Sequence, residues 1–277
     1  IRDQGFAALL APQIVNNGVI SARLGKIALA SSQAVTLDFY GDNLLSFAAS
    51  DALQAALDDD QALIDQQGIL RADGGSITMT TRAASDVLAN SVNLDGITQA
   101  RSVSEQNGRI VLSAEGSVSI HTDNLIDASG GGDIGITAES LSQGGTITAS
   151  GTDEAGSVTL DISEQLIMAG SIEATASAGI GGDVTIEANS IIENQANQIN
   201  ASGRDGGGTI SVSANAGMMS SGDYDASSSQ GNGGRIDITA TDLRLLGATL
   251  DASGETQGGL VRLGGSFQGG KTPGMPQ

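Results

Sequence analysis

The chain has 277 residues, 32 of them acidic and 12 basic, which gives a formal net charge of −20 at pH 7. Nucleic acids and anionic membrane surfaces attract basic proteins, so this charge argues against nucleic acid binding and against binding to an anionic membrane. The sequence has no cysteine and no apolar run of about 18 residues, so disulfide bonds are excluded and we expect no membrane insertion by a helix.

Short apolar and polar runs, separated by turn-forming sequences, predict strands throughout residues 1–49. The pieces follow in the order Gly5-Phe6-Ala7-Ala8-Leu9-Leu10-Ala11-Pro12, Asn17-Gly18-Val19-Ile20-Ser21-Ala22, Gly25-Lys26-Ile27-Ala28-Leu29-Ala30 and Val35-Thr36-Leu37-Asp38-Phe39. This order resembles the end of the secretion domain in the filamentous-haemagglutinin family, the large exoproteins of two-partner secretion in Gram-negative bacteria. The family's earlier Asn-Pro-Asn motifs are absent and the chain begins without Met inside a pattern, so we expect a piece of a longer protein.

The β pattern is interrupted in the next segment. A helical excursion is expected near residues 50–67, because Ser50 can cap a helix and because Leu53, Leu57 and Ile64 fall on one face of it.

A unit of about 25 residues then repeats to the end of the regular pattern. Each unit has a triplet of an apolar residue, a polar residue and an alanine, followed by a polar or glycine corner and an alternating strand. The triplets begin at Ile20, Leu70, Ile126, Ile147, Ile172, Ile199, Tyr224 and Leu250. From Ile110 onward, the first residues of the alternating strands are 24, 24, 26, 26, 26 and 25 residues apart.

A period of this length indicates a solenoid, and the unit leaves no room for an amphipathic helix. We therefore predict an all-β fold, a right-handed parallel β-helix with about 25 residues per turn. The alanines are expected to form an interior ladder where the wall bends. The glycine-rich corners are interpreted as turns and not as phosphate loops, because no helix follows them.

Catalytic and metal chemistry finds little support in the sequence. His121 is the only histidine, so a transition-metal site is not expected. Polysaccharide lyases and glycosidases occur on parallel β-helices, but here the carboxylates are scattered through corners and do not cluster beside aromatic residues. We expect no enzyme activity, no metal site and no cofactor, with a lyase or glycosidase and calcium binding at Asp-rich corners as the alternatives.

One corner carries the candidate ligand-binding residues Asp223, Tyr224 and Asp225. Tyr224 replaces the usual isoleucine of its triplet, so its ring could be exposed to a sugar. We favour the simpler interpretation, that the ring fills the wall of the β-helix.

The resemblance divides the chain into four parts: residues 1–49 as the C-terminal part of a secretion domain, 50–100 as turns with helical excursions, 101–265 as regular repeats and 266–277 as an irregular tail. It implies a segment of a large secreted adhesin of the bacterial cell surface or biofilm matrix, acting as a rigid stalk and a glycan-contact surface. It also implies two partners, an outer-membrane transporter and a polysaccharide receptor on host or bacterial surfaces. A self-assembling extracellular matrix fibre is the alternative.

Overall fold

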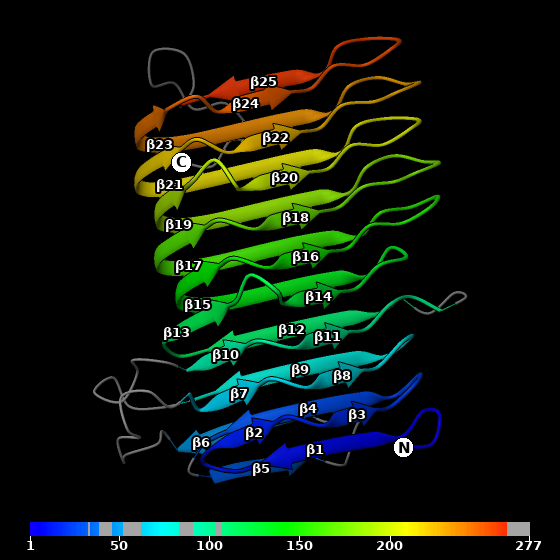
Figure 1. The fold of residues 1–277 in the computed structure, drawn as a ribbon, viewed down its shortest axis with the longest axis vertical. Helices are drawn as coiled ribbons and strands as arrows, with labels where there is room; N and C mark the ends of the chain where they lie inside the picture. The colour runs from blue at the N-terminus through cyan, green and yellow to red at the C-terminus, as the bar shows by residue number, and fades with distance from the viewer. Residues whose placement is uncertain (33, 39–45, 52–61, 83–90, 104–106, 265–277) are drawn as a thin grey trace.

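The computed structural model describes residues 1–32, 34–38, 46–51, 62–82, 91–103 and 107–264. These residues form a parallel β-solenoid, in which the chain winds upward from the N-terminal strands at the bottom of Figure 1 to the C-terminal strands at the top. Within the described residues there is no helix, and therefore none long and apolar enough to cross a membrane.

The first wall of the solenoid is a single parallel path of strands. It contains, in order, β1 (Phe6–Leu10), β4 (Lys26–Ser31), β9 (Ser76–Thr81), β12 (Arg109–Ala114), β15 (Asp133–Gln143), β17 (Ser157–Met168), β19 (Asp183–Glu193), β21 (Thr209–Ser220), β23 (Arg235–Leu245) and β25 (Leu260–Leu263). From β15 to β23 these strands shift register near their middle, for instance between Ala138 and Ser140, and their second halves form another wall. In earlier turns that wall is formed by β2 (Ile14–Asn16), β7 (Ile64–Gln66), β10 (Val92–Leu94) and β13 (Ser117–Ile120).

The remaining wall is a parallel sheet of three-residue strands. Its members are β3 (Val19–Ser21), β8 (Ile69–Arg71), β11 (Ile97–Gln99), β14 (Leu125–Asp127), β16 (Thr146–Thr148), β18 (Ser171–Glu173), β20 (Gln198–Asn200), β22 (Asp223–Asp225) and β24 (Thr249–Asp251). A separate antiparallel pair joins β5 (Ala34–Asp38) and β6 (Ser46–Asp51).

The pairing register confirms the predicted period. Partners along the first wall from Arg109 to Leu260 are separated by 24, 24, 26, 26, 26 and 25 residues, which makes about seven regular turns. Earlier turns are less even, because Lys26 pairs with Ser76 and Ser76 pairs with Arg109. The right-handed sense stays a prediction from the crossover rule.

The prediction of a helix near residues 50–67 is wrong at both of the ends that the structure describes. Ser50 lies within β6, and Ile64 lies in β7 between the parallel strands β2 and β10. Residues 52–61 fall outside the described residues. Ile64 is completely buried and its backbone N–H donates to the carbonyl of Ser91 at 3.0 Å, so at this residue stacking in the wall outweighs the helical spacing.

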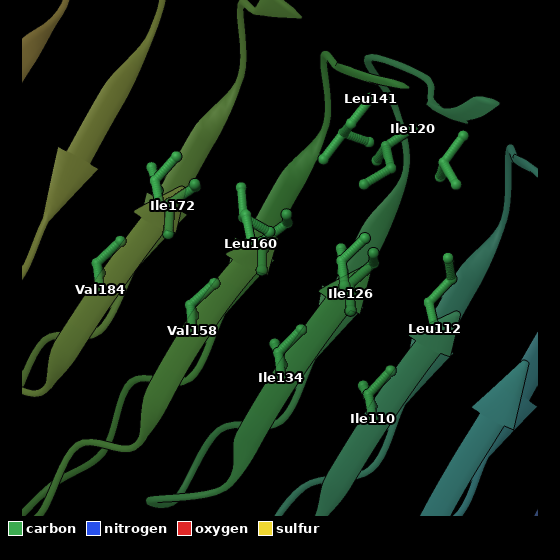
Figure 2. Packing of buried hydrophobic residues seen from close by; sticks show 14 of the residues in the cluster. Ile110, Leu112, Ile120, Ile126, Ile134, Leu141, Val158, Leu160, Ile172 and Val184 are labelled. Atoms are coloured by element: carbon green, nitrogen blue, oxygen red, sulfur yellow. The ribbon is translucent and has the colours of Figure 1, made fainter. Parts of the chain in front are cut away.

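The core consists of columns of identical or similar apolar side chains. Figure 2 shows Ile110, Ile134, Val158 and Val184 stacked along the first wall, in the order that the strand register gives. Burying each such side chain contributes about 1.5–3 kcal/mol relative to leaving it exposed. The predicted alanine ladder is present, with fully buried members Ala22, Ala72, Ala100, Ala128, Ala149, Ala174, Ala201 and Ala226.

Most ladder alanines also close the loop that follows them. The carbonyl of Ala201 accepts a hydrogen bond from Gly208 N–H at 2.8 Å, and Ala174 and Gly182 repeat the arrangement at 2.7 Å. A Cβ atom at Gly208 would lie 2.1 Å from the carbonyl oxygen of Gly182 one turn earlier. The corner glycines therefore allow a close approach between stacked backbones.

Candidate functional site

Tyr224 lies inside the solenoid, and only 1 % of its surface is exposed. Of the two interpretations of this ring, the structure therefore confirms the one in which it fills the wall, and an exposed ring is wrong. The middle residue of β22 points inward, and it stacks between Ile199 and Leu250 in the same column. Asp223 and Asp225 flank it on the outward side, and their contact with a glycan stays a prediction.

The phenol of Tyr224 contacts the buried carboxylate of Glu193, which lies one turn earlier. Tyr224 Oη donates a hydrogen bond to Glu193 Oε2, and Ser220 Oγ donates to the same oxygen at 2.6 Å. Burial raises the pKa of the Glu193 carboxyl, while the two hydrogen bonds oppose that shift. Burial and the neighbouring Glu193 raise the pKa of the Tyr224 hydroxyl, so the phenol stays protonated and acts as a donor.

The corner next to this pair contains further buried polar atoms. Glu193 Oε1 and both side-chain polar atoms of Asn197 have no hydrogen-bond partner among the described residues. A Cβ at Gly222 would lie 3.1 Å from Asn197 Nδ2, so the amide packs directly beneath that glycine. Sequence reasoning missed Glu193, although its period-two phase with buried Ile191 indicates an inward side chain. These polar atoms are shielded from solvent and lack hydrogen-bond partners within the described part of the chain, so they influence the stability of the fold.

The polar residue of several triplets has a local structural role. Asp225 Oδ1 accepts the backbone N–H of Ser227 at 2.8 Å, and Asn200 Oδ1 accepts that of Ser202 at 2.9 Å. The side chain thereby caps the turn that follows the strand. At Asp251 the same kind of hydrogen bond, from Ser253 N–H, lowers the pKa of the carboxyl.

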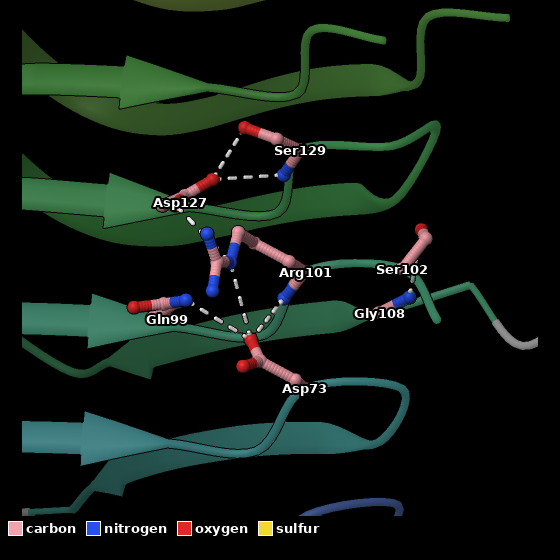
Figure 3. Close-up of polar contacts among 7 residues, drawn as sticks. All are labelled: Asp73, Gln99, Arg101, Ser102, Gly108, Asp127 and Ser129. Carbon is pink, nitrogen blue, oxygen red and sulfur yellow. Dashed lines mark hydrogen bonds and ion pairs between the residues drawn. The ribbon is translucent and has the colours of Figure 1, made fainter. Parts of the chain in front are cut away.

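An arginine links three successive turns near the start of the regular repeats (Figure 3). Asp73 Oδ1 accepts hydrogen bonds from Gln99 Nε2 and from the backbone N–H of Arg101, both at 3.1 Å. Arg101 Nε lies 3.5 Å from Asp73 Oδ1 and 4.0 Å from Asp127 Oδ2. Arg101 is half exposed, so these ion pairs fix the register of neighbouring loops more than they add stability.

The loops that follow β18, β20 and β22 stack on one another and project from one edge of the solenoid (Figure 1). A cavity of about 390 Å³, which we call the loop groove, lies along them. Its lining residues are Thr175, Ala176, Ser177, Asn200, Ser202, Gly203, Arg204, Ser227 and Ser229. Isolated bridges pair Ala176 with Gly203 and Gly203 with Ser228, so equivalent positions of three turns lie side by side.

The remaining titratable candidates are dispersed. His121 is half exposed, and its Nδ1 lies 3.3 Å from Asp95 Oδ1 on the surface. Over the part of the chain that the structure describes, no group of three or more His, Cys, Asp or Glu side chains is arranged to hold a metal ion. Among the described residues, the loop groove and the Glu193–Tyr224 cluster are the features that we consider further.

Comparison with known proteins gives one partial similarity. The chain is 27 % identical over 142 residues to the heme/hemopexin-binding protein of Haemophilus influenzae. The match covers 50 % of this chain and 14 % of that protein. No family model matches the chain, and no solved structure matches it. The chain is thus a β-solenoid segment with a distant, partial likeness to a much longer binding protein.

Proposed function

We propose that this chain is a structural segment of a large secreted exoprotein of two-partner secretion, exported through an outer-membrane transporter and held at the cell surface or in the extracellular matrix. The observation that carries the proposal is the continuous parallel ladder from β1 to β25. Each turn pairs with the turns before and after it, so the segment has the properties of a rigid stalk. The likeness of residues 1–49 to the end of a haemagglutinin-type secretion domain supports the export route.

The segment's second role in this proposal is adhesive contact with glycans on host cells or in bacterial polysaccharide. A binding role agrees with the name of the Haemophilus protein to which half of the chain is similar. Heme and hemopexin, which the name of that protein gives as its ligands, are candidate ligands here as well.

Export is tested by producing the full parent protein in a Gram-negative host with and without its transporter. We expect the parent to appear in the medium or on the cell surface only when the transporter is present. Equal secretion in both strains would contradict the two-partner route.

Adhesion is tested by applying the purified chain to arrays of host glycans and bacterial exopolysaccharides, with hemopexin and heme as separate arms and with or without calcium. Saturable binding by a monomer in sedimentation velocity is the expected result. Assembly that increases with protein concentration, without any ligand, would instead favour a matrix fibre.

A further inference from the structure

We propose that the loop groove binds a linear, uncharged polysaccharide that lies along the stacked loops. This inference rests on the adhesive role proposed above and assigns it a site and a ligand class. The groove crosses three turns, and equivalent residues of each turn line it at a spacing of about 4.8 Å. A repeating surface of this kind suits an extended polymer better than a compact small molecule.

The lining offers hydrogen-bonding groups that the fold does not use. Within the described part of the chain, the hydroxyls of Ser177, Ser202, Ser227 and Ser229 have no hydrogen-bond partner, although all four lie along the groove. Their neighbours are used differently, because Thr175 Oγ1 donates to Ser150 Oγ at 3.0 Å. Hydroxyls both donate and accept, so the free serines match the hydroxyls of a sugar chain.

The same surface is unsuited to a peptide that would add to a strand edge. The backbone groups of the loops already bond from turn to turn, as Ala176 N–H donates to Ser202 C=O at 3.0 Å and Gly203 N–H donates to Ser227 C=O at 3.1 Å. Binding by strand addition requires an unpaired edge, and the groove floor does not present one.

Charge favours an uncharged chain over an anionic one. Arg204 is the only lysine or arginine between residues 110 and 234, and its Nε donates to Asp205 Oδ1 at 2.8 Å. The guanidinium is thus partly neutralised, within a protein of net charge −20 that repels polyanions. Its remaining N–H groups can donate to sugar oxygens at the rim of the groove.

The test uses isothermal titration of the purified chain with two probes of equal length, a neutral β-glucan hexasaccharide and a hexagalacturonate. The groove variant combines Ser177→Ala, Ser202→Ala and Ser229→Ala, which remove hydroxyls that bond to no protein group. The matched control combines Thr159→Ala, Thr185→Ala and Ser211→Ala, which remove three hydroxyls from the outer face of β17, β19 and β21. Thermal unfolding of each variant verifies its fold.

We expect the neutral probe to bind saturably, with a dissociation constant that rises at least tenfold in the groove variant and is unchanged in the control. Three outcomes would overturn the proposal: no binding of the neutral probe by the folded chain, an equal loss in both variants, or binding of the hexagalacturonate alone. If transporter-dependent export and array binding persist under any of these outcomes, only the groove assignment fails and the proposed function stands.

Discussion

At the scale of single residues, the buried carboxyl of Glu193 makes stability depend on pH. Its pKa is raised in the folded protein, so the native state holds a proton that the unfolded chain releases near its ordinary pKa of about 4.3. The contribution of this group is fully present below that pH and is lost as the pH rises through the folded-state pKa. Glu193→Gln keeps a neutral acceptor for Tyr224 and Ser220.

We therefore expect Glu193→Gln to gain stability relative to the wild type as the pH is raised from about 4.5 to 8, with the smallest difference at the acid end. Urea denaturation at several pH values measures this difference. The other carboxylates are common to both proteins and cancel in the comparison. A difference that is independent of pH would show that Glu193 does not titrate over this range.

One turn earlier, the positions equivalent to Glu193 and Tyr224 are filled without polar groups. Met168 and Ile199 occupy the columns of Glu193 and Tyr224, and both are buried. We expect Tyr224→Ile alone to lower the free energy of unfolding by about 1–3 kcal/mol, because the carboxyl loses a donor. Adding Glu193→Met removes the buried carboxyl and should restore wild-type stability or exceed it. Additive losses in urea denaturation of the double variant would contradict this coupling.

The sequence identified Tyr224 as unusual but not its partner. The ring follows the inward phase of its triplet, so alternation alone predicts the buried position that the structure has. Glu193 is 31 residues away from Tyr224, more than one full turn. No local pattern joins two residues at that separation, and only the stacking of turns brings them together.

At the scale of elements, corner glycines set how closely neighbouring turns can stack. We expect Gly208→Ala to destabilise the protein by about 1–3 kcal/mol or more, because its Cβ would lie 2.1 Å from Gly182 O. Gly135→Ala is the matched control, since a Cβ there meets no atom within 4 Å, and it should stabilise strand β15 by about 0.5–1 kcal/mol. Thermal unfolding of both variants measures the contrast, and equal effects would contradict a steric requirement at Gly208.

The repeat period, the parallel strands and the alanine ladder were predictable because each follows from spacing along one chain. The helix near residues 50–67 was not a good prediction, because Ile64 satisfies both a helical face and a strand phase. Its partners Ile14 and Val92, which decide between the two, are distant in the sequence. The loop groove was missed for a similar reason, since its lining comes from loops of three successive turns.

At the scale of the whole molecule, stacking aligns acidic residues that are far apart in the unfolded chain. Asp161 on β17 and Glu187 on β19 are register partners, and both are exposed. Asp225 on β22 is likewise the register partner of Asp251 on β24. Two unit charges at the strand spacing of about 4.8 Å repel each other by about 1 kcal/mol in water. Folding therefore concentrates negative charge on a protein whose net charge is −20.

Added salt should screen this repulsion and stabilise the solenoid. We expect the free energy of unfolding to rise as NaCl increases from about 0.01 M to 0.15 M, since the Debye length falls from about 30 Å to about 8 Å. Asp161→Asn together with Glu187→Gln should reduce that dependence, because one repelling pair is removed. Urea denaturation across the salt series measures both slopes. Calcium at equal ionic strength tells screening from binding: stabilisation equal to that by NaCl supports screening, whereas a larger, saturable effect would mean that an acidic column binds the ion.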